Sequence, residues 1–317
     1  EDIPGNESPV SIWVSGIPQP AMVTHIEPDP SIPLLKDDQQ ISIHFSQPLS
    51  DIGSITTTSL AYSSMGLEAT YSAEDTSIKI TINDPWASLD TVMFALNNIM
   101  DWAETGTDEK TTTYTTYLLG DYNDDFFVDV ADLSSFVSAW NSEDYSYELG
   151  PVTGTVPHLI PSRNQSYDLR DMMVFTRMWH YSHATSTNRL LVYDPVGSEL
   201  TIRQEGNHLI VDLPSETSAA HVYLSYPRES KTITPPENIN SDDVMQLAYH
   251  HGELGQLVVE KAFMKREGVK NTSFDMSSLD RSNALIEINY VAYDDSNRVI
   301  ARGTQTFNII AIPNEFA

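Results

Sequence analysis

Side chains that carry oxygen recur at fixed intervals in residues 121–132. They stand at positions 1, 3, 5, 9 and 12 of this twelve-residue window, as Asp121, Asn123, Asp125, Asp129 and Asp132. Position 7 adds a backbone carbonyl, that of Phe127. Calcium binds six to eight oxygen ligands, and a loop that turns back on itself can direct alternate residues inward. The spacing therefore predicts a calcium-binding loop formed by these residues.

The residues on either side indicate how the loop is held. The i, i+3, i+4, i+7 spacing of one apolar helix face follows the loop, in Leu133, Phe136, Val137 and Trp140. Residues 111–119, by contrast, are rich in Thr and Tyr and predict a strand. The loop is thus expected to have a helix after it and none before it.

Two motifs carry this pattern, Gly120-Asp121-x-Asn123-x-Asp125 and Val128-Asp129-x-x-Asp132-Leu133. A calcium loop with only the exit helix resembles the half EF-hand of the dockerin family. One departure lies at position 6, where that family has Gly in a turn with positive φ and this chain has Phe126. A bulky side chain is costly in that conformation, so we expect a weakened affinity for calcium.

Dockerins carry the half EF-hand twice, and a second copy follows here at an offset of 39 residues. Carboxylates and apolar helix positions recur, at Asp168, Asp171, Met172, Phe175 and Trp179. Position 1 becomes Ile160, so this copy has lost a ligand. A second calcium site would use Asn164, the backbone carbonyl of Ser166, Asp168, Asp171 and, from outside the loop, Glu148. The alternative is a structural copy without metal. Residues 149–157, rich in Gly and Pro, are expected to form a connector.

The dockerin resemblance also implies where a partner would bind. In that family the partner contacts lie at loop positions 10 and 11, which are Val130 and Ala131 in the first copy and Leu169 and Arg170 in the second. These residues are less polar than is usual, so a surface packed within the chain is an equal alternative. The implied partner is a cohesin-like domain, in the same chain or in another.

The chain on both sides of this unit is patterned as β-strands. Apolar and polar residues alternate, or β-branched residues dominate, at 41–45, 78–82, 91–96, 209–213, 221–226, 256–260, 285–293 and 306–312. The stretch Ile43-His-Phe45-Ser-Gln-Pro48-Leu49 resembles a signature of bacterial immunoglobulin-like domains. The stretch Ala220-His-Val-Tyr-Leu-Ser-Tyr226-Pro227 resembles the early strand and turn of cohesins, and a generic jelly roll is the alternative.

These patterns predict a mainly β fold class with a small α insert. Two antiparallel β-sandwiches, one Ig-like and one cohesin-like or jelly-roll-like, would flank a dockerin-like calcium-binding helical unit. The expected boundaries are a linker or the end of a preceding domain at 1–23, the Ig-like sandwich at 24–119, the dockerin-like unit at 120–188, the cohesin-like sandwich at 189–312, and the start of a removed C-terminal sorting segment at 313–317. The last boundary rests on a resemblance of residues 312–317 to proteins exported by the type IX secretion system.

The composition argues against several classes of function. The 17 Lys and Arg residues against 45 Asp and Glu residues give a formal net charge of −28. This argues against binding to nucleic acid, which requires a basic surface. The chain has no cysteine and no apolar run long enough to span a bilayer, so neither a disulfide framework nor membrane insertion is expected. The composition fits a secreted bacterial protein, extracellular or at the cell surface, in contact with divalent cations.

The sequence contains no recognisable catalytic motif: a Gly-x-Ser-x-Gly elbow, a phosphate loop and a dinucleotide fingerprint are all missing. His250 and His251 are expected in a surface turn. Trp86 and Trp102 could stack on sugars, although packing in the core or in turns is the simpler explanation. No catalytic residue is therefore assigned.

We expect a non-enzymatic, secreted structural or assembly module stabilised by one or two Ca²⁺ ions. The dockerin-like and cohesin-like units would pack within one chain or between chains. The short connector at 181–190 favours the first arrangement, because close tethering gives a high effective concentration. The alternative is a carbohydrate-binding accessory region of a secreted polysaccharide-degrading enzyme, with an extracellular polysaccharide as partner.

Overall fold

In a computed structural model, the chain forms two compact units. The first comprises the described residues up to Asp84 together with Thr91–Thr115, and the second comprises Pro85–Asp90 and the described residues from Thr116 onward. The structure describes residues 20–33, 40–62, 69–104, 106, 109–185, 195–227, 236, 239–241, 243–251, 255–265, 267–277 and 285–309.

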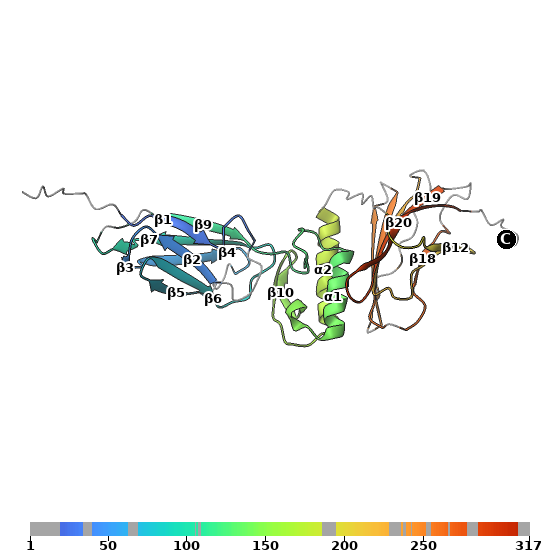
Figure 1. The fold of residues 1–317 in the computed structure, drawn as a ribbon, viewed down its shortest axis with the longest axis horizontal. Helices are drawn as coiled ribbons and strands as arrows, with labels where there is room; N and C mark the ends of the chain where they lie inside the picture. The colour runs from blue at the N-terminus through green and yellow to red at the C-terminus, as the bar shows by residue number, and fades with distance from the viewer. Residues whose placement is uncertain are drawn as a thin grey trace, which may run out of the picture. The chain divides into compact units, whose positions relative to one another are not determined.

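The first unit is built from antiparallel strands joined by turns (Figure 1). Its strands are β1 (Val23–Glu27), β2 (Gln40–Phe45), β3 (Leu49–Asp51), β4 (Ser54–Ser59), β5 (Ala69–Glu74), β6 (Ser77–Ile82), β7 (Thr91–Asn97), β8 (Met100–Asp101) and β9 (Lys110–Thr115). One sheet has the order β1-β2-β6-β5, a second has the order β4-β7-β9, and β3 pairs with β8.

Alternating side chains explain why these strands form a sandwich. In β2, β6 and β7 the inward positions are apolar and buried, at Ile41, Ile43, Phe45, Ile78, Ile80, Ile82, Val92, Phe94 and Leu96. Phe94 of β7 meets Tyr114 of β9 edge to face, with ring centroids 5.9 Å apart. Each of the two larger sheets therefore has one face lined by buried apolar side chains. The strands predicted at 41–45, 78–82 and 91–96 are all present.

The second unit begins with a two-helix segment, residues 120–185. Its helices are α1 (Val130–Ser142) and α2 (Leu169–Thr185), with the 3₁₀ helix η1 (Tyr145–Tyr147) between them. An antiparallel hairpin of β10 (Val152–Thr155) and β11 (His158–Pro161) also lies between the helices, where we expected an irregular connector. Gly154 makes the hairpin possible, because its φ is 84° and a Cβ there would lie 2.5 Å from the carbonyl oxygen of His158.

The two helices pack through equivalent residues of the repeat. Phe136 of α1 stacks on Phe175 of α2, with ring centroids 5.5 Å apart and ring planes inclined by 27°. Trp179 is fully buried. Its counterpart Trp140 is half-buried and stacks on Tyr167, with centroids 5.1 Å apart. The sequence repeat is therefore also a structural repeat.

The remainder of the second unit is a second β-sandwich. Its strands are β12 (Thr201–Glu205), β13 (His208–Asp212), β14 (Ala219–Ser225), β15 (Ile239–Asn240), β16 (Val244–His251), β17 (Gln256–Phe263), β18 (Asn271–Asp275), β19 (Leu285–Tyr293) and β20 (Val299–Asn308). The smaller sheet has the order β12-β13-β18, and the larger has the order β15-β16-β17-β14-β19-β20. Leu209, Val211 and Phe274 of the smaller sheet share one core with Val222 and Ile288 of the larger sheet.

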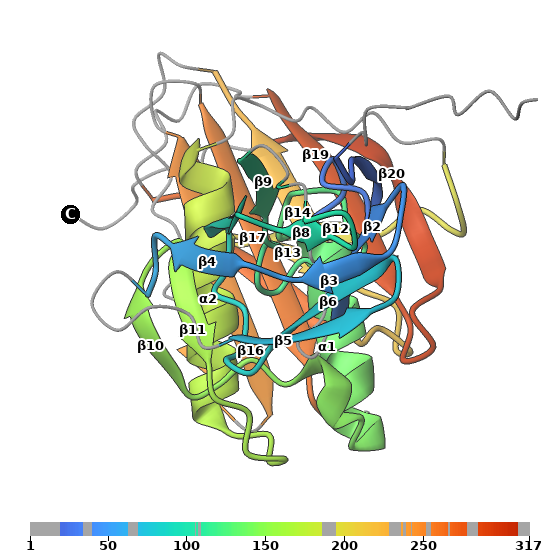
Figure 2. The ribbon, with the colours of Figure 1, turned by 90° about the vertical axis from the view of Figure 1, so that its left-hand side faces the viewer.

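The middle of the larger sheet is covered on both faces. Ala220, Val222 and Leu224 of β14 point into the sandwich core. The opposite face, which carries His221 and Tyr223, is covered by α1 and α2, and Figures 1 and 2 show both helices next to the strands of this sheet. Six consecutive residues of β14 are buried for this reason, whereas a sheet with one face in water would alternate.

The chain has the predicted fold class: it is mainly β, with a small α insert between two antiparallel β-sandwiches. The strand expected at 306–312 is the end of β20, which stops at Asn308. Most of the predicted linker at 1–23 and all of the predicted sorting segment at 313–317 lie outside the described residues. None of the described helices combines the length and the apolar character needed to cross a membrane.

Phe175 provides a test of the helix packing, because it is fully buried in the helix pair. Phe175→Ala leaves a cavity, and we expect the free energy of unfolding of the second unit to fall by about 3–5 kcal/mol. Met173 lies on the same helix and is 51% exposed, so Met173→Ala should change this free energy by less than about 0.5 kcal/mol. Urea unfolding followed by circular dichroism compares the variants. Equal effects would contradict the packing described.

Candidate functional site

The side-chain oxygens of the first loop accept hydrogen bonds from the loop's own backbone. Oδ1 of Asp121 and Oδ1 of Asn123 both accept from the N–H of Asp125, at 3.2 and 3.0 Å. Oδ2 of Asp121 accepts from the N–H of Phe126 at 2.7 Å. Oδ1 of Asp125 accepts from the N–H of Phe127 at 3.0 Å. These bonds hold the oxygens of positions 1, 3 and 5 against the inside of the loop.

Position 6 has the backbone conformation that the motif demands. The φ of Phe126 is 63°, and its side chain is 57% exposed. The left-handed conformation costs a residue with a side chain about 1–2 kcal/mol, which is why Gly suits this position better. The loop therefore keeps its turn in spite of the bulky residue.

Asp132 closes the loop from the first turn of α1. Its Oδ1 accepts from the N–H of Tyr122 at 2.7 Å, and its Oδ2 accepts from the N–H of Asp129 at 3.0 Å. Asp129 caps the helix by accepting from the N–H of Ala131 at 2.7 Å. Together Asp129 and Asp132 form a capping box, so two of the predicted calcium ligands also have a structural role.

The carboxylates of this loop are crowded and partly buried. Burial raises the pKa of Asp121, and the nearby charges of Asp125 and Asp124 raise it further. Burial also raises the pKa of Asp129 to about 6 and that of Asp132 to about 8. A cation among these groups would favour their charged forms and lower these pKa values.

The donor types fit calcium, although the carboxylates are not gathered around one point. Within the described ranges, a single group has three histidine or carboxylate ligand atoms within 4.8 Å of one another, and it lies in the first unit. Ligand oxygens on opposite sides of a bound calcium ion are at most about 5 Å apart, given Ca–O distances of 2.3–2.6 Å. Oxygens on opposite sides of a calcium ion can thus lie slightly farther apart than the atoms of that group.

Glu148 takes the place of the missing first ligand in the second loop. Its Oε1 accepts from the N–H of Asn164 at 2.5 Å, and its Oε2 accepts from the N–H of Gln165 at 2.8 Å. These two N–H groups are the counterparts, 39 residues further on, of the two that donate to Asp121. Gln165 has a φ of 58°, as position 6 requires. The position-1 equivalent is therefore Glu148 and not Ile160, the residue that a constant offset assigns.

Asp171 repeats the contacts of Asp132. Its Oδ2 accepts from the N–H of Asp168 at 2.9 Å, and its Oδ1 accepts from the N–H groups of Leu149 at 3.0 Å and Gly150 at 2.8 Å. Leu149 thus occupies the place of the position-2 residue. The second loop has the bonding pattern of the first, with the β10–β11 hairpin inserted between its positions 2 and 3.

A salt bridge distinguishes the second loop from the first. Arg170 contacts both carboxylate oxygens of Asp168, with Nε 2.9 Å from Oδ2, and this pairing lowers the pKa of Asp168. The first copy has Ala131 at the position equivalent to Arg170. A cation in the second loop would compete with this arginine, so the first loop is the better candidate for a metal.

A buried carboxylate joins both helices to the larger sheet. Glu260 of β17 is fully buried, and its Oε2 accepts from the indole N–H of Trp179 in α2 at 2.7 Å. The carboxylate also accepts from the backbone N–H of Val130, the first residue of α1. Its Oε1 lies 3.1 Å from Nδ1 of His221 on β14. Burial raises the pKa of Glu260 well above its ordinary value and lowers that of His221 to about 4.

His183 of α2 brings this cluster next to the first loop. Its Nε2 lies 3.9 Å from Oε1 of Glu260, and its ring packs on Trp179 with centroids 4.0 Å apart. The ring also contacts Phe127, the position-7 residue of the loop, at 4.8 Å. Burial lowers the pKa of His183 to about 3. The loop, α2 and the sheet therefore meet at one place.

The four residues predicted to bind a partner divide between two surfaces. Val130 is buried and Ala131 is half-buried where α1 meets the sheet, so the first pair is used within the chain. Leu169 and Arg170 are exposed. The two copies thus differ in what they present to solvent.

Glu260 and His221 are functional candidates that the sequence did not reveal. They are cross-strand partners on β17 and β14, so they share one face of the sheet. The only available signal was the length of the apolar run around His221, which indicates a strand covered on both faces.

The remaining candidates are partly packed and partly exposed. Trp86 is buried, whereas Trp102 is 75% exposed. His250 and His251 end strand β16 and do not form the expected surface turn, because this strand pairs with β17 as far as His251. In the part of the chain that the structure describes, the only Trp or Phe side chains classed as exposed are Trp102 and Phe126. They lie in different units and form no row on which a polysaccharide could stack.

No family model matches the chain, and no curated protein matches it. A cohesin module from a family 33 glycoside hydrolase of Clostridium perfringens is 12% identical, over 37% of this chain and 97% of that one, with a TM-score of 0.28. A type II cohesin domain from the cellulosome of Acetivibrio cellulolyticus is 14% identical. The match covers 36% of this chain and 95% of that one, with a TM-score of 0.26. The collagen-binding domain of surface protein RspB from Erysipelothrix rhusiopathiae is 8% identical. The match covers 92% of this chain and 94% of that one, with a TM-score of 0.23. Values this low do not identify a function.

Glu260→Ala tests the contact between the helices and the sheet. The substitution leaves buried donors of Trp179 and Val130 without an acceptor, and each unpaired buried donor costs about 1–3 kcal/mol. We expect the free energy of unfolding of the second unit to fall by about 3 kcal/mol or more. Glu287→Ala, at an exposed position of β19, is the matched control. Chemical denaturation measures both, and a change below 1 kcal/mol in Glu260→Ala, on the order of a surface substitution, would show that the carboxylate does not join these elements.

Proposed function

We propose that this chain is a calcium-stabilised structural module of an extracellular or cell-surface protein. In this proposal the two-helix segment is a dockerin-like unit that is joined permanently to the cohesin-like sandwich of the same chain. The observation that carries the proposal is the packing of α1 and α2 on the larger sheet around the buried Glu260. The role is mechanical and interactive, not catalytic: the module holds neighbouring parts of a larger assembly at fixed positions.

The first loop supports the calcium part of the proposal. Asp121, Asn123, Asp125, Asp129 and Asp132, with the carbonyl of Phe127, are the residues that would hold the ion. An ion there would supply positive charge to carboxylates whose pKa values are raised by burial and by one another. The second loop already has Arg170 beside Asp168, so one calcium ion per chain is proposed.

The arrangement of exposed residues supports a role in assembly. The outer face of the larger sheet at β14, β16 and β17 is covered by the chain's own helices, so this part of the sheet does not offer an open surface to a second protein. The N-terminus of α2, with Leu169 and Arg170, remains exposed and is the place where a cohesin-like partner from another chain would bind. The acidic, cysteine-free composition suits an environment rich in divalent cations.

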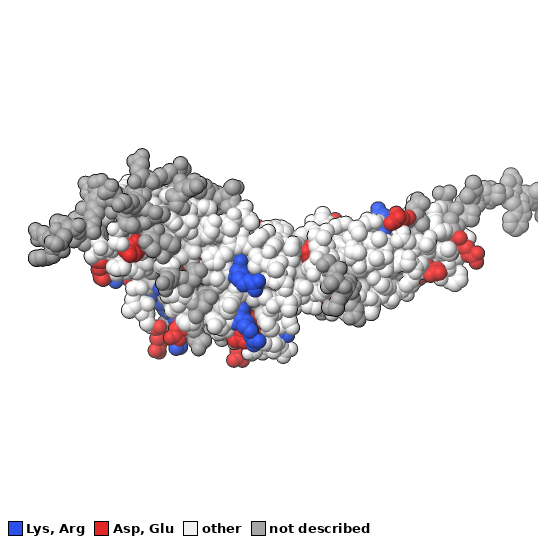
Figure 3. Space-filling view, turned by 180° about the vertical axis from the view of Figure 1, so that it is seen from behind, with Lys and Arg blue, Asp and Glu red and all other residues white. Residues whose placement is uncertain are grey.

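The distribution of charge supports a partner other than nucleic acid. The formal net charge is −28. On the face drawn in Figure 3, the described Lys and Arg side chains form small groups and no broad basic area. A polyanion would find no continuous surface to bind on that face.

The calcium proposal predicts a metal-dependent stability of the second unit. Extracellular loops of this type bind calcium with dissociation constants of about 10⁻⁴ to 10⁻³ M. In 10⁻² M calcium, binding to the folded state alone should raise the free energy of unfolding by about 1–3 kcal/mol relative to the same protein in EDTA. A thermal melt in the two buffers measures the difference, and calorimetric titration should give one ion per chain.

Two variants locate the ion. Asp121→Ala should abolish the calcium-dependent rise, because it removes the position-1 ligand. Asp168→Ala should lower stability equally in both buffers, because Asp168 is a cap of α2 that is already paired with Arg170. Superimposable melts of the wild type with calcium and with EDTA would exclude the calcium proposal. Size-exclusion chromatography at several concentrations tests the permanent joining within one chain, which requires a monomer.

A further inference from the structure

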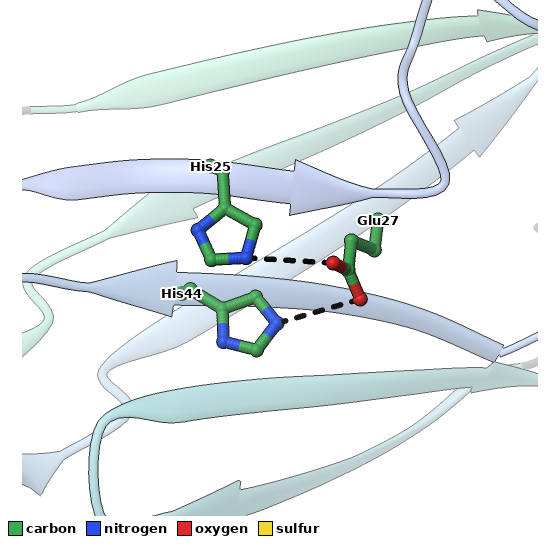
Figure 4. Close-up of side chains that lie close together, drawn as sticks. All are labelled: His25, Glu27 and His44. Carbon is green, nitrogen blue, oxygen red and sulfur yellow. Dashed lines mark ion pairs between the residues drawn. The ribbon is translucent and has the colours of Figure 1, made fainter.

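The first unit contains a cluster of side chains that the proposed function does not use. His25 and Glu27 of β1 and His44 of β2 turn toward one another on the outer face of this pair of strands (Figure 4). One ligand atom from each lies within 4.8 Å of the other two. β1 is the edge strand of its sheet, so the cluster is open to solvent on one side.

A β-bulge sets the two histidines opposite each other. The register of β1 and β2 shifts between Val23 and His25, which leaves Thr24 as an extra residue. Without the shift, His25 would pair with Ile43 and its side chain would face the core. The bulge instead pairs His25 with His44, and both rings lie on the outer face of the sheet.

The separations of the ligand atoms are close to those of a metal site. The two imidazole rings are stacked, with centroids 4.1 Å apart and planes 2° apart. Nε2 of His25 lies 3.5 Å from Oε1 of Glu27, and Nε2 of His44 lies 3.9 Å from Oε2. Ligand atoms around a tetrahedral zinc ion are about 3.3–3.6 Å apart, given metal–ligand distances of 2.0–2.2 Å. Because the two rings are parallel, their lone pairs do not converge, and the exposed His25 side chain would have to rotate to direct both nitrogens at one ion.

Thr24 determines which nitrogen of His25 carries the proton. The Thr24 hydroxyl donates its hydrogen to the carbonyl oxygen of His44 at 3.1 Å. Its oxygen therefore accepts from Nδ1 of His25, 3.3 Å away. Nε2 then faces the carboxylate of Glu27, where its lone pair can bind either a proton or a metal ion.

His44 gives independent support. Its Nε2 is shielded from solvent and has no hydrogen-bond partner. Buried polar atoms without a partner are uncommon, and a bound ion is one of the explanations for them. Glu27 and His25 have side chains that are 69% and 55% exposed, so an ion can enter from the solvent side.

We propose that His25, Glu27 and His44 bind a divalent transition-metal ion of the zinc type. Imidazole nitrogen favours such ions, and two histidines with one carboxylate leave a fourth position for water or another ligand. The oxygen ligands of residues 121–132 select a different, harder ion. The bound metal would join the edge strand β1 to β2 and stabilise the first unit.

The test is a calorimetric titration of the metal-free full chain with Zn²⁺ in the presence of millimolar calcium. The wild type should bind zinc, and His25→Asn and His44→Asn should each weaken the affinity by at least about tenfold. Loss of a residue that only hydrogen-bonds to a metal ligand already lowers metal affinity by about 10–100-fold. His208→Asn, at an exposed strand position of the second unit, should leave the affinity unchanged. Asp121→Ala should also leave it unchanged. Equal affinities in the wild type and the His25 and His44 variants would overturn the proposal.

A second measurement does not depend on how the variants fold. In ¹⁵N-labelled wild-type chain, zinc should shift the side-chain Nε2 resonances of His25 and His44, and Nδ1 of His25 should remain protonated. Zinc saturation without a change in these two resonances would mean that any bound ion lies elsewhere, and the proposal would fail.

Discussion

The second unit depends on one buried carboxylate, that of Glu260. Its donors come from three elements, the indole of Trp179, the backbone of Val130 and the imidazole of His221. Removing a carboxylate from water costs several kcal/mol unless well-placed donors replace the water. The two helices and the sheet can satisfy Glu260 in one mutual arrangement, so the carboxylate contributes specificity of packing more than strength.

The packing around Glu260 also positions the first loop, although the loop is not a part of the sheet. Ser182 of α2 accepts from the N–H of Val128 in the loop at 3.1 Å, and His183 packs on Phe127. The same helix carries Trp179, which donates to Glu260. The two copies of the repeat are therefore interdependent: α2 positions the loop of the first copy, while α1 and α2 share the sheet.

Local patterns in the sequence were sufficient to predict the helices and strands, but not to predict the contacts between them. The helix after residue 132 and most strands follow from spacing alone, because their signals lie within a few residues. Glu148 could not be assigned to the second loop with certainty, since the inserted hairpin breaks the constant offset. Glu260 and His221 are 39 residues apart and meet through strand register. His25 and His44 meet because of a bulge, which the alternation of apolar residues does not reveal.

The inserted hairpin makes the hydrogen bonds of the second loop span more residues than those of the first. In the first loop, the bonds to Asp121 span four or five residues. In the second loop, Glu148 meets its partners across 16 and 17 residues, and the intervening chain must be ordered before those bonds can form. Contacts that are local in sequence form faster. The inserted hairpin therefore raises the entropic cost of closing the second loop above that of the first, although the two loops use the same set of bonds.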